Sequence, residues 1–143
     1  MRVEKSIEIN KPAAEVFEYL QNFDNATKWQ HDVVSTQMIE GASNAVGSRY
    51  TESRKFLNKE MKTTLEITAF DKNKKWGAKV IEGPVTYEIT ITFTEIPQGT
   101  KLTTVVEGEP KGFFKLAENM VANALGNNLE ESQQNLKSLL ESK

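Results

Sequence analysis

A regular alternation of apolar and polar residues dominates the middle of this 143-residue chain. It is clearest in the segment VTYEITITF, residues 85–93, where apolar residues occupy every second position and Thr or Glu lies between them. Successive side chains of a β-strand point to opposite faces, so a period of two predicts a strand with one apolar and one polar face. The apolar positions are Val85, Tyr87, Ile89, Ile91 and Phe93. Because the apolar face must be covered, we expect a sheet that buries one side.

The same alternation recurs along most of the chain between residues 33 and 109. Together with 85–96, the segments that it predicts as strands are 33–40, 47–56, 60–70, 75–82 and 100–109. The connections between them are short and contain Gly, Pro and Asn, the residues typical of turns. Short connections join antiparallel neighbours, because a parallel pair needs a crossover of about a dozen residues or more. The sequence therefore predicts an antiparallel meander.

One further strand and a helical segment precede this meander. Val3, Ile7 and Ile9 alternate with polar residues, which predicts a strand at the amino terminus. Asn10 and Pro12 suit the start of a helix, because Asn caps free backbone N–H groups and Pro lacks an N–H that the first turn does not use. The helical spacing ends near residue 22, and the segment NFDNATKW then begins a second helical piece. Two short helices are therefore expected after the first strand.

A long helix is expected from residue 113 onward, after the segment PKG at 110–112 ends the alternation. Its apolar residues recur at three- and four-residue spacing and form a single stripe. They are Phe113, Ala117, Met120, Val121, Ala124, Leu125, Leu129, Leu136, Leu139 and Leu140. Gly126 lies inside this predicted helix, where a Gly costs about 1 kcal/mol of helix stability relative to Ala. Either it lets the helix approach the sheet closely, or it makes a bend that leaves room for a ligand.

This order of elements defines an α+β fold in which seven strands with one apolar face curl around a cover, and the terminal helix is the only segment long enough to fill their concavity. The sequence resembles the START-like (SRPBCC, helix-grip) superfamily, and within it the polyketide cyclase/dehydrase and lipid-transport branch. The likeness covers essentially the whole chain. It is carried by IEINKPAAEVFEYLQNFDNATKW, VGSRYTESRKF, GPVTYEITITFTEIPQGTKLTTVVEGE and the terminal helix.

The resemblance implies a single START-like domain over residues 1–143. In this fold a curved seven-stranded antiparallel sheet wraps around the long C-terminal helix, and the two short helices help to close one end of a cavity. Trp29 would then lie at the rim or floor of that cavity. The resemblance specifies function poorly, because carriers, cyclases, hydroxylase domains and chaperone co-activators share the fold.

Composition and charge exclude several classes of function. A formal net charge of −2 provides no basic field that would attract nucleic acid. The absence of cysteine excludes thiol catalysis, disulfides and thiolate metal sites. No apolar run approaches the roughly 20 residues that span a bilayer, and the first residues do not resemble a signal peptide. We therefore expect a cytoplasmic protein, a monomer or weak dimer, without stable membrane insertion.

His31 is the only histidine of the chain. A metal site needs several converging ligands, and without cysteine only carboxylates remain to complete one, so no metal and no cofactor are expected. As a lone general base, His31 could act from the mouth of a cavity. A polar residue between a helix and a strand is more often simply solvated.

The predicted strand at 47–56 places charged residues on its apolar face. Tyr50, Glu52, Arg54 and Phe56 share one side, and the two aromatic residues mark that side as the inner one. A buried charge is expensive unless it is paired. Glu52 and Arg54 therefore form either a polar anchor for a carboxylate, hydroxyl or carbonyl of a ligand, or an ion pair at the rim or in solvent.

The leading hypothesis is that the protein binds or transports a small hydrophobic, lipid- or polyketide-like molecule between the sheet and the C-terminal helix. The alternatives are a polyketide cyclase or dehydratase that uses a few polar groups of the cavity, and a protein-interaction module that regulates a partner. No second His and no inward Asp support catalysis, so no catalytic residue is assigned. The candidate ligand-binding residues are Trp29, Tyr50, Glu52, Arg54, Leu65, Trp76, Tyr87, Ile89, Met120 and Ala124.

Overall fold

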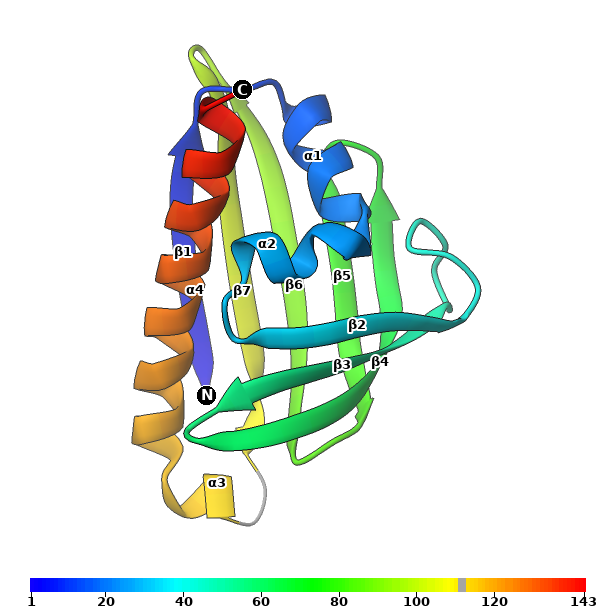
Figure 1. Cartoon of the computed structure of the whole chain (residues 1–143), viewed down its shortest axis with the longest axis vertical. Coiled ribbons are helices and arrows are strands. Elements are labelled where there is room, and N and C mark those ends of the chain that lie inside the picture. The colour runs from blue at the N-terminus through cyan, green and yellow to red at the C-terminus, as the bar shows by residue number, and fades with distance from the viewer. Residues whose placement is uncertain (111–112) are drawn as a thin grey trace.

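The structure, a computed structural model, describes residues 1–110 and 113–143. Seven strands form one sheet, and helical segments lie between β1 and β2 and after β7 (Figure 1). The strands are β1 (Arg2–Ile9), β2 (Val33–Glu40), β3 (Arg49–Phe56), β4 (Lys59–Asp71), β5 (Lys75–Glu82), β6 (Val85–Ile96) and β7 (Gly99–Pro110). The helices are α1 (Ala13–Gln21), the 3₁₀ segment η1 (Phe23–Asn25), α2 (Ala26–Trp29), α3 (Phe113–Leu116) and α4 (Glu118–Glu141).

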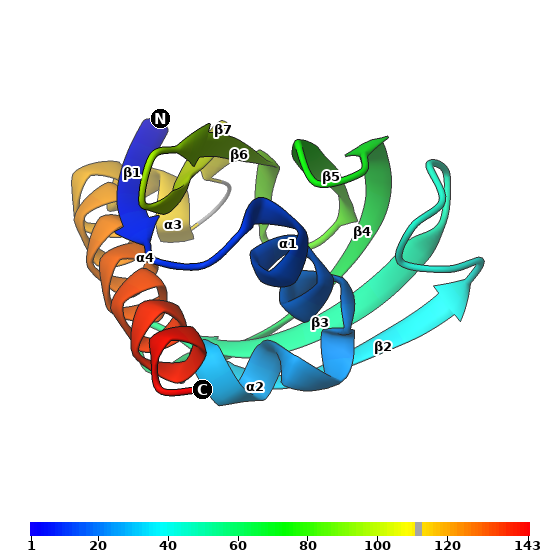
Figure 2. The same cartoon turned by 90° about the horizontal axis from the view of Figure 1, so that it is seen from above.

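The sheet is antiparallel throughout, in the order β1-β7-β6-β5-β4-β3-β2. Consecutive strands from β2 to β7 are neighbours, and β1 adds to the far side of β7, so the predicted meander and the predicted seven-stranded sheet are confirmed. Seen from above, the sheet forms a curved shell with α1 inside the curve and α4 along β1 (Figure 2). This arrangement is the predicted helix-grip fold.

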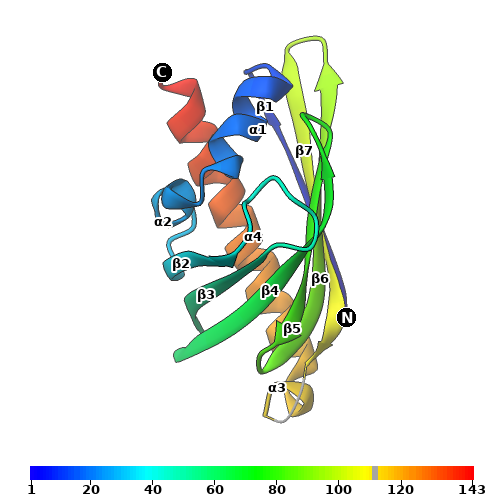
Figure 3. The same cartoon turned by 90° about the vertical axis from the view of Figure 1, so that its right-hand side faces the viewer.

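Irregularities in two strand pairs accompany this curvature. The register shifts twice between β2 and β3, and again twice between β4 and β5. An extra residue on one strand bends that strand and increases its twist. In Figure 3 the strands β2 and β3 cross toward α2, while β5, β6 and β7 stand upright beside them. The bent half of the sheet therefore turns back over its own concave face.

The helical region after β7 differs from the prediction of one continuous helix. Ala117 has φ −112° and ψ 32°, outside the helical region, and it separates α3 from α4. Of the predicted apolar stripe, Met120 is 59 % exposed here, whereas Val121 is buried. The sequence could not show this break, since Ala is the best helix former. Of the break predicted at 110–112, Lys111 and Gly112 lie outside the described residues.

The largest part of the core lies where α1 and the end of α4 meet β1, β7 and β6. Phe17 of α1 packs edge-to-face against Phe70 and Phe93, with ring centroids 5.4 and 5.0 Å apart. Leu136 and Leu140 of α4 are fully buried in the same cluster. Burying such a side chain contributes about 1.5–3 kcal/mol. This cluster fixes α1 and α4 at one end of the sheet and leaves the region beside α2 less filled.

Gly126 lies within an uninterrupted α4 and faces β1. A Cβ atom built on it would lie 3.5 Å from Lys5 Cε and 3.7 Å from Val3 Cγ1, which are ordinary van der Waals distances. The helix therefore neither bends at Gly126 nor opens space for a ligand there. The approach of α4 to β1 does not require glycine either, because the spacing leaves room for one methyl group.

We expect Gly126→Ala to stabilise the protein by about 1 kcal/mol, because Ala removes the helix penalty of Gly and its methyl group fits. Chemical denaturation measures the change. Gly108→Ala is the matched control, since its Cβ would overlap the Thr86 carbonyl oxygen on the neighbouring strand and should destabilise the sheet. A loss of stability in Gly126→Ala would contradict the spacing between α4 and β1.

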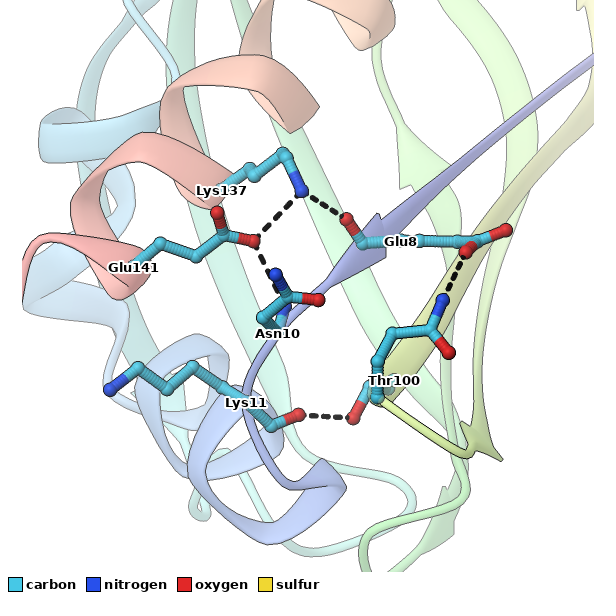
Figure 4. Close-up of polar contacts among 7 residues, drawn as sticks. Glu8, Asn10, Lys11, Thr100, Lys137 and Glu141 are labelled. Carbon is cyan, nitrogen blue, oxygen red and sulfur yellow. Dashed lines mark hydrogen bonds and ion pairs between the residues drawn. The ribbon is translucent and has the colours of Figure 1, made fainter.

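The carboxyl end of α4 is fastened to the end of β1 by a network of polar contacts (Figure 4). Lys137 Nζ donates to the Glu8 carbonyl oxygen at 2.6 Å and to Glu141 Oε2 at 2.8 Å. The backbone N–H of Asn10 donates to the same carboxylate oxygen at 2.9 Å. The hydrogen bonds from Lys137 and Asn10 hold the pKa of Glu141 below its usual value. The ionised form of Glu141 is therefore the one that the fold prefers.

Glu141→Gln should lower the melting temperature at neutral pH, and the difference from the parent protein should depend on pH. Because the pKa of Glu141 is lower in the folded than in the unfolded chain, its contribution is present above the ordinary value of about 4.5 and is lost as the pH falls through the folded pKa. Thermal melts between pH 7 and pH 3 test this. Glu95→Gln, an exposed glutamate of β6, is the control and should show no such convergence.

Candidate functional site

A cavity of about 100 Å³ lies between the inner face of the sheet, the segment from α1 to α2, and the middle of α4. Its wall is mainly aromatic and aliphatic, with a polar group of residues from β2, β3 and α4. The aromatic residues that line it are Phe23, Trp29, Tyr50, Trp76, Tyr87 and Phe93. The polar and charged ones are Gln21, Gln30, Thr36, Glu52, Arg54, Thr104, Asn128, Ser132 and Gln133. A largely apolar cavity with a few convergent polar groups is typical of a small-molecule site.

Most of the candidate ligand-binding residues line this cavity. They are Trp29, Tyr50, Glu52, Arg54, Leu65, Trp76, Tyr87 and Ile89. The alternation in β3 through β6 points the seven that lie on strands to the concave face, as the period of two predicts. Trp29 ends α2 at the cavity wall, where its carbonyl oxygen accepts a hydrogen bond from Asn135 Nδ2 of α4 at 3.3 Å. The structure thus places Trp29 at the junction of the short helices with α4.

The structure does not place Met120 or Ala124 at the cavity, which corrects the prediction for these two residues. The Met120 side chain is 59 % exposed. Ala124 packs against the cluster of Phe56, Met61, Val85 and Val121 at the other end of the sheet. The first turns of α4 pack against this cluster, and the cavity lies beside the middle of the helix.

The part of α4 that faces the cavity is one to three turns further along and is polar. Asn128, Leu129, Ser132 and Gln133 line the wall, and the last two are buried to 6 % and 3 % exposure. Gln133 Nε2 donates to the Lys5 carbonyl oxygen at 3.0 Å. Sequence reasoning missed these residues because it followed the apolar stripe. The gap in that stripe between Leu129 and Leu136 is the signal that could have found them.

Arg54 is the centre of the polar end of the cavity. Its Nε donates to Glu52 Oε1 at 2.8 Å, its Nη1 to Asp32 Oδ2 at 2.8 Å, and its Nη2 to Gln30 Oε1 at 3.0 Å. The side chains of Arg54, Asp32 and Glu52 are 17 %, 15 % and 11 % exposed. Burial disfavours the charged guanidinium, but the neighbouring carboxylates outweigh this effect and raise the pKa of Arg54. The cluster therefore holds its charges in place inside the protein.

These contacts show which face Glu52 and Arg54 occupy, whereas their role toward a ligand stays a prediction. Both side chains face inward, as the aromatic residues of β3 indicated, and both are already paired. Arg54 is thus an anchor between the turn before β2 and the strand β3, since Gln30 and Asp32 precede β2 and Glu52 lies in β3. Sequence reasoning missed Asp32 and Gln30 because nothing in the sequence shows which turn the guanidinium reaches.

We expect Arg54→Met to destabilise the protein by about 3 kcal/mol, because it leaves two inward carboxylates without their cation. Denaturant unfolding at pH 7 measures the loss. Arg49→Met in the same strand removes an exposed guanidinium that lies 3.4 Å from Glu66, a pair worth at most about 1 kcal/mol. Equal stabilities for the two variants would contradict the role of Arg54 as an anchor.

Tyr50 and Tyr87 bring two phenols to the same region. Burial raises the pKa of both, and the Glu52 carboxylate raises it further. The phenols therefore stay protonated and can donate hydrogen bonds. Tyr50 also packs with Phe23 and Trp76, at centroid distances of 4.8 and 6.3 Å. The aromatic wall and the polar end of the cavity thus meet at Tyr50.

His31 lies outside the cavity wall, and its side chain is 63 % exposed. Its Nδ1 is 3.0 Å from Glu131 Oε1, and Asn135 Nδ2 lies 3.2 Å from its Nε2. This position agrees with a solvated surface residue. Within residues 1–110 and 113–143, no group of three or more His, Asp or Glu side chains is arranged to hold a metal ion. The described helices also include none that is long and apolar enough to cross a membrane.

Comparison with known proteins identifies the family. A family model described as polyketide cyclase/dehydrase and lipid transport matches residues 1–141. The chain therefore belongs to this family, as the resemblance of its motifs predicted, and its fold is that of the START-like superfamily. No protein of curated function matches the sequence.

Solved structures share the fold at low sequence identity. TTHA0849 from Thermus thermophilus superposes with a TM-score of 0.86 at 18 % identity, over 100 % of both chains. A START superfamily protein from Mycobacterium smegmatis gives 0.85 at 15 % identity, over 99 % of this chain and 97 % of that one. Ginseng major latex-like protein 151 from Panax ginseng gives 0.78 at 14 % identity, covering 96 % and 95 %. At these identities the likeness shows the fold alone.

Proposed function

We propose that the protein binds a small hydrophobic molecule in the cavity beside α2 and carries or stores it. The observation that supports this most directly is the cavity itself, an apolar and aromatic enclosure with a polar group at one end. Membership of a family described by polyketide cyclase/dehydrase and lipid transport is in agreement. The cyclase or dehydratase alternative and the protein-interaction alternative remain predictions from the sequence.

The size of the cavity favours a compact ligand or a compact part of one. Its volume of about 100 Å³ is below the range of roughly 300–1,000 Å³ of sites for drug-sized molecules. It is closer to the volume of about 150 Å³ of an engineered apolar cavity that binds benzene in another protein. A single-ring compound such as toluene is therefore a suitable probe of whether the cavity accepts an apolar guest.

The experiment that tests the proposal is a titration with toluene, followed by NMR of the backbone amides and the two indole N–H groups of Trp29 and Trp76. We expect saturable shifts at residues that line the cavity. Ser132→Leu should abolish them, because Ser132 lines the cavity and the added methylenes would occupy the guest's space.

Ala124→Leu is the matched control on the same helix. It adds methylenes to a packed cluster away from the cavity, so it should reduce stability by about 1–3 kcal/mol and leave toluene binding intact. Absence of saturable binding to the parent protein, or unchanged binding to Ser132→Leu, would refute the proposal. Native mass spectrometry of the purified protein is an independent check for a bound molecule.

A further inference from the structure

The charged groups at the polar end of the cavity do not balance. Arg54 contributes one positive charge, whereas Glu52 and Asp32 contribute one negative charge each, and both carboxylates lie 2.8 Å from the guanidinium. Asp32 contacts Arg54 from behind the cavity wall, and the polar side chains that line this end beside Glu52 and Arg54, such as Gln30 and Thr36, are neutral. The polar end therefore has an excess of one negative charge in a poorly solvated place.

Two polar atoms at this end, Glu52 Oε2 and Thr36 Oγ1, have no hydrogen bond from a described residue, and both can accept one. Arg54 bonds to Oε1 of Glu52, and no hydrogen bond from a described residue reaches Oε2. Thr36 pairs with Glu52 in the register of β2 and β3. Its Oγ1 is buried and, among the described residues, has no hydrogen-bond partner. A buried polar atom without a partner is costly. The Thr36 hydroxyl could donate or accept, whereas Glu52 Oε2 can only accept, so a ligand donor is the group that serves both.

The remaining N–H groups of Arg54 raise the alternative of a carboxylate ligand, because a guanidinium has five donors and three are in use. Two carboxylates at 2.8 Å already overcompensate its charge. A third negative charge beside them would be repelled in a region of low dielectric. A protonated amine meets the opposite situation, since the excess charge and the surrounding aromatic rings both attract a cation.

We infer that the cavity selects compact apolar molecules with a hydrogen-bond donor head, a protonated amine or a hydroxyl group, and discriminates against carboxylates. This inference rests on the proposed function, because it assigns the polar end of the same ligand site. It reverses the role first expected for Arg54: the group that meets the ligand is the Glu52 carboxylate, and Arg54 positions it.

The test compares four single-ring compounds of similar size with different heads: benzylamine, benzyl alcohol, toluene and benzoate. NMR titrations at pH 7 and constant ionic strength give the dissociation constants. We expect benzylamine and benzyl alcohol to bind more tightly than toluene, and benzylamine to bind at least about tenfold more tightly than benzoate, the scale of one hydrogen bond to a charged group. Equal or tighter binding of benzoate overturns the inference.

Glu52→Gln tests the assigned residue, because the amide keeps the shape and the acceptor for Arg54 Nε but removes the excess charge. The preference for benzylamine over benzoate should fall by about tenfold or more. The control is Glu88→Gln, which removes the same charge from the exposed face of β6 and should leave the preference unchanged. An unchanged preference in a folded Glu52→Gln protein overturns the inference.

Toluene distinguishes failure of the binding site from failure of its selectivity. If toluene binds in the cavity but the preference for donor heads is absent, the proposed function stands and this inference fails. If none of the four compounds binds, both fail. If Glu52→Gln does not fold, the ranking of the four compounds on the parent protein still decides the inference.

Discussion

Burial of one apolar sheet face is the interaction on which the remaining structure depends. Alternation makes most of that face apolar, and the register shifts in β2–β3 and β4–β5 accompany the curvature that makes the face concave. One helix cannot cover so wide a surface. The helix α4 lies along β1, α1 lies over β6 and β7, and α2 lies between β2 and α4 (Figures 1 and 2). The cavity is the space that these three helices leave against the sheet.

The sequence predicted the elements that depend on a repeated pattern. A period of two determined the strands and their inner face, which is why Tyr50, Tyr87 and Ile89 were assigned to the cavity wall from the sequence alone. Such a pattern averages over many residues, so one unfavourable position does not change it. The short antiparallel connections then left little freedom in the order of the strands.

The features that the sequence did not predict depend on single contacts between distant residues. Which turns of α4 face the cavity depends on how far along β1 the helix is placed, and the structure puts Asn128, Leu129, Ser132 and Gln133 there. Helix periodicity contains no information about such an offset along the axis. Likewise, the alternation in β3 places Arg54 inward. Only the folded chain shows that its guanidinium reaches Asp32 and Gln30 in the segment before β2.

The Arg54 cluster is better understood as a positioning device than as a source of stability. Removing charges from water is costly, and buried ion pairs are often replaced by apolar residues without loss of stability. What an apolar cluster would not provide is direction. One guanidinium with three acceptors fixes the separation of the turn before β2 from β3 and holds the Glu52 carboxylate at the cavity wall. An unbalanced charge at this wall does not improve the packing of the interior. It is the feature by which the proposed site would orient one end of an apolar guest.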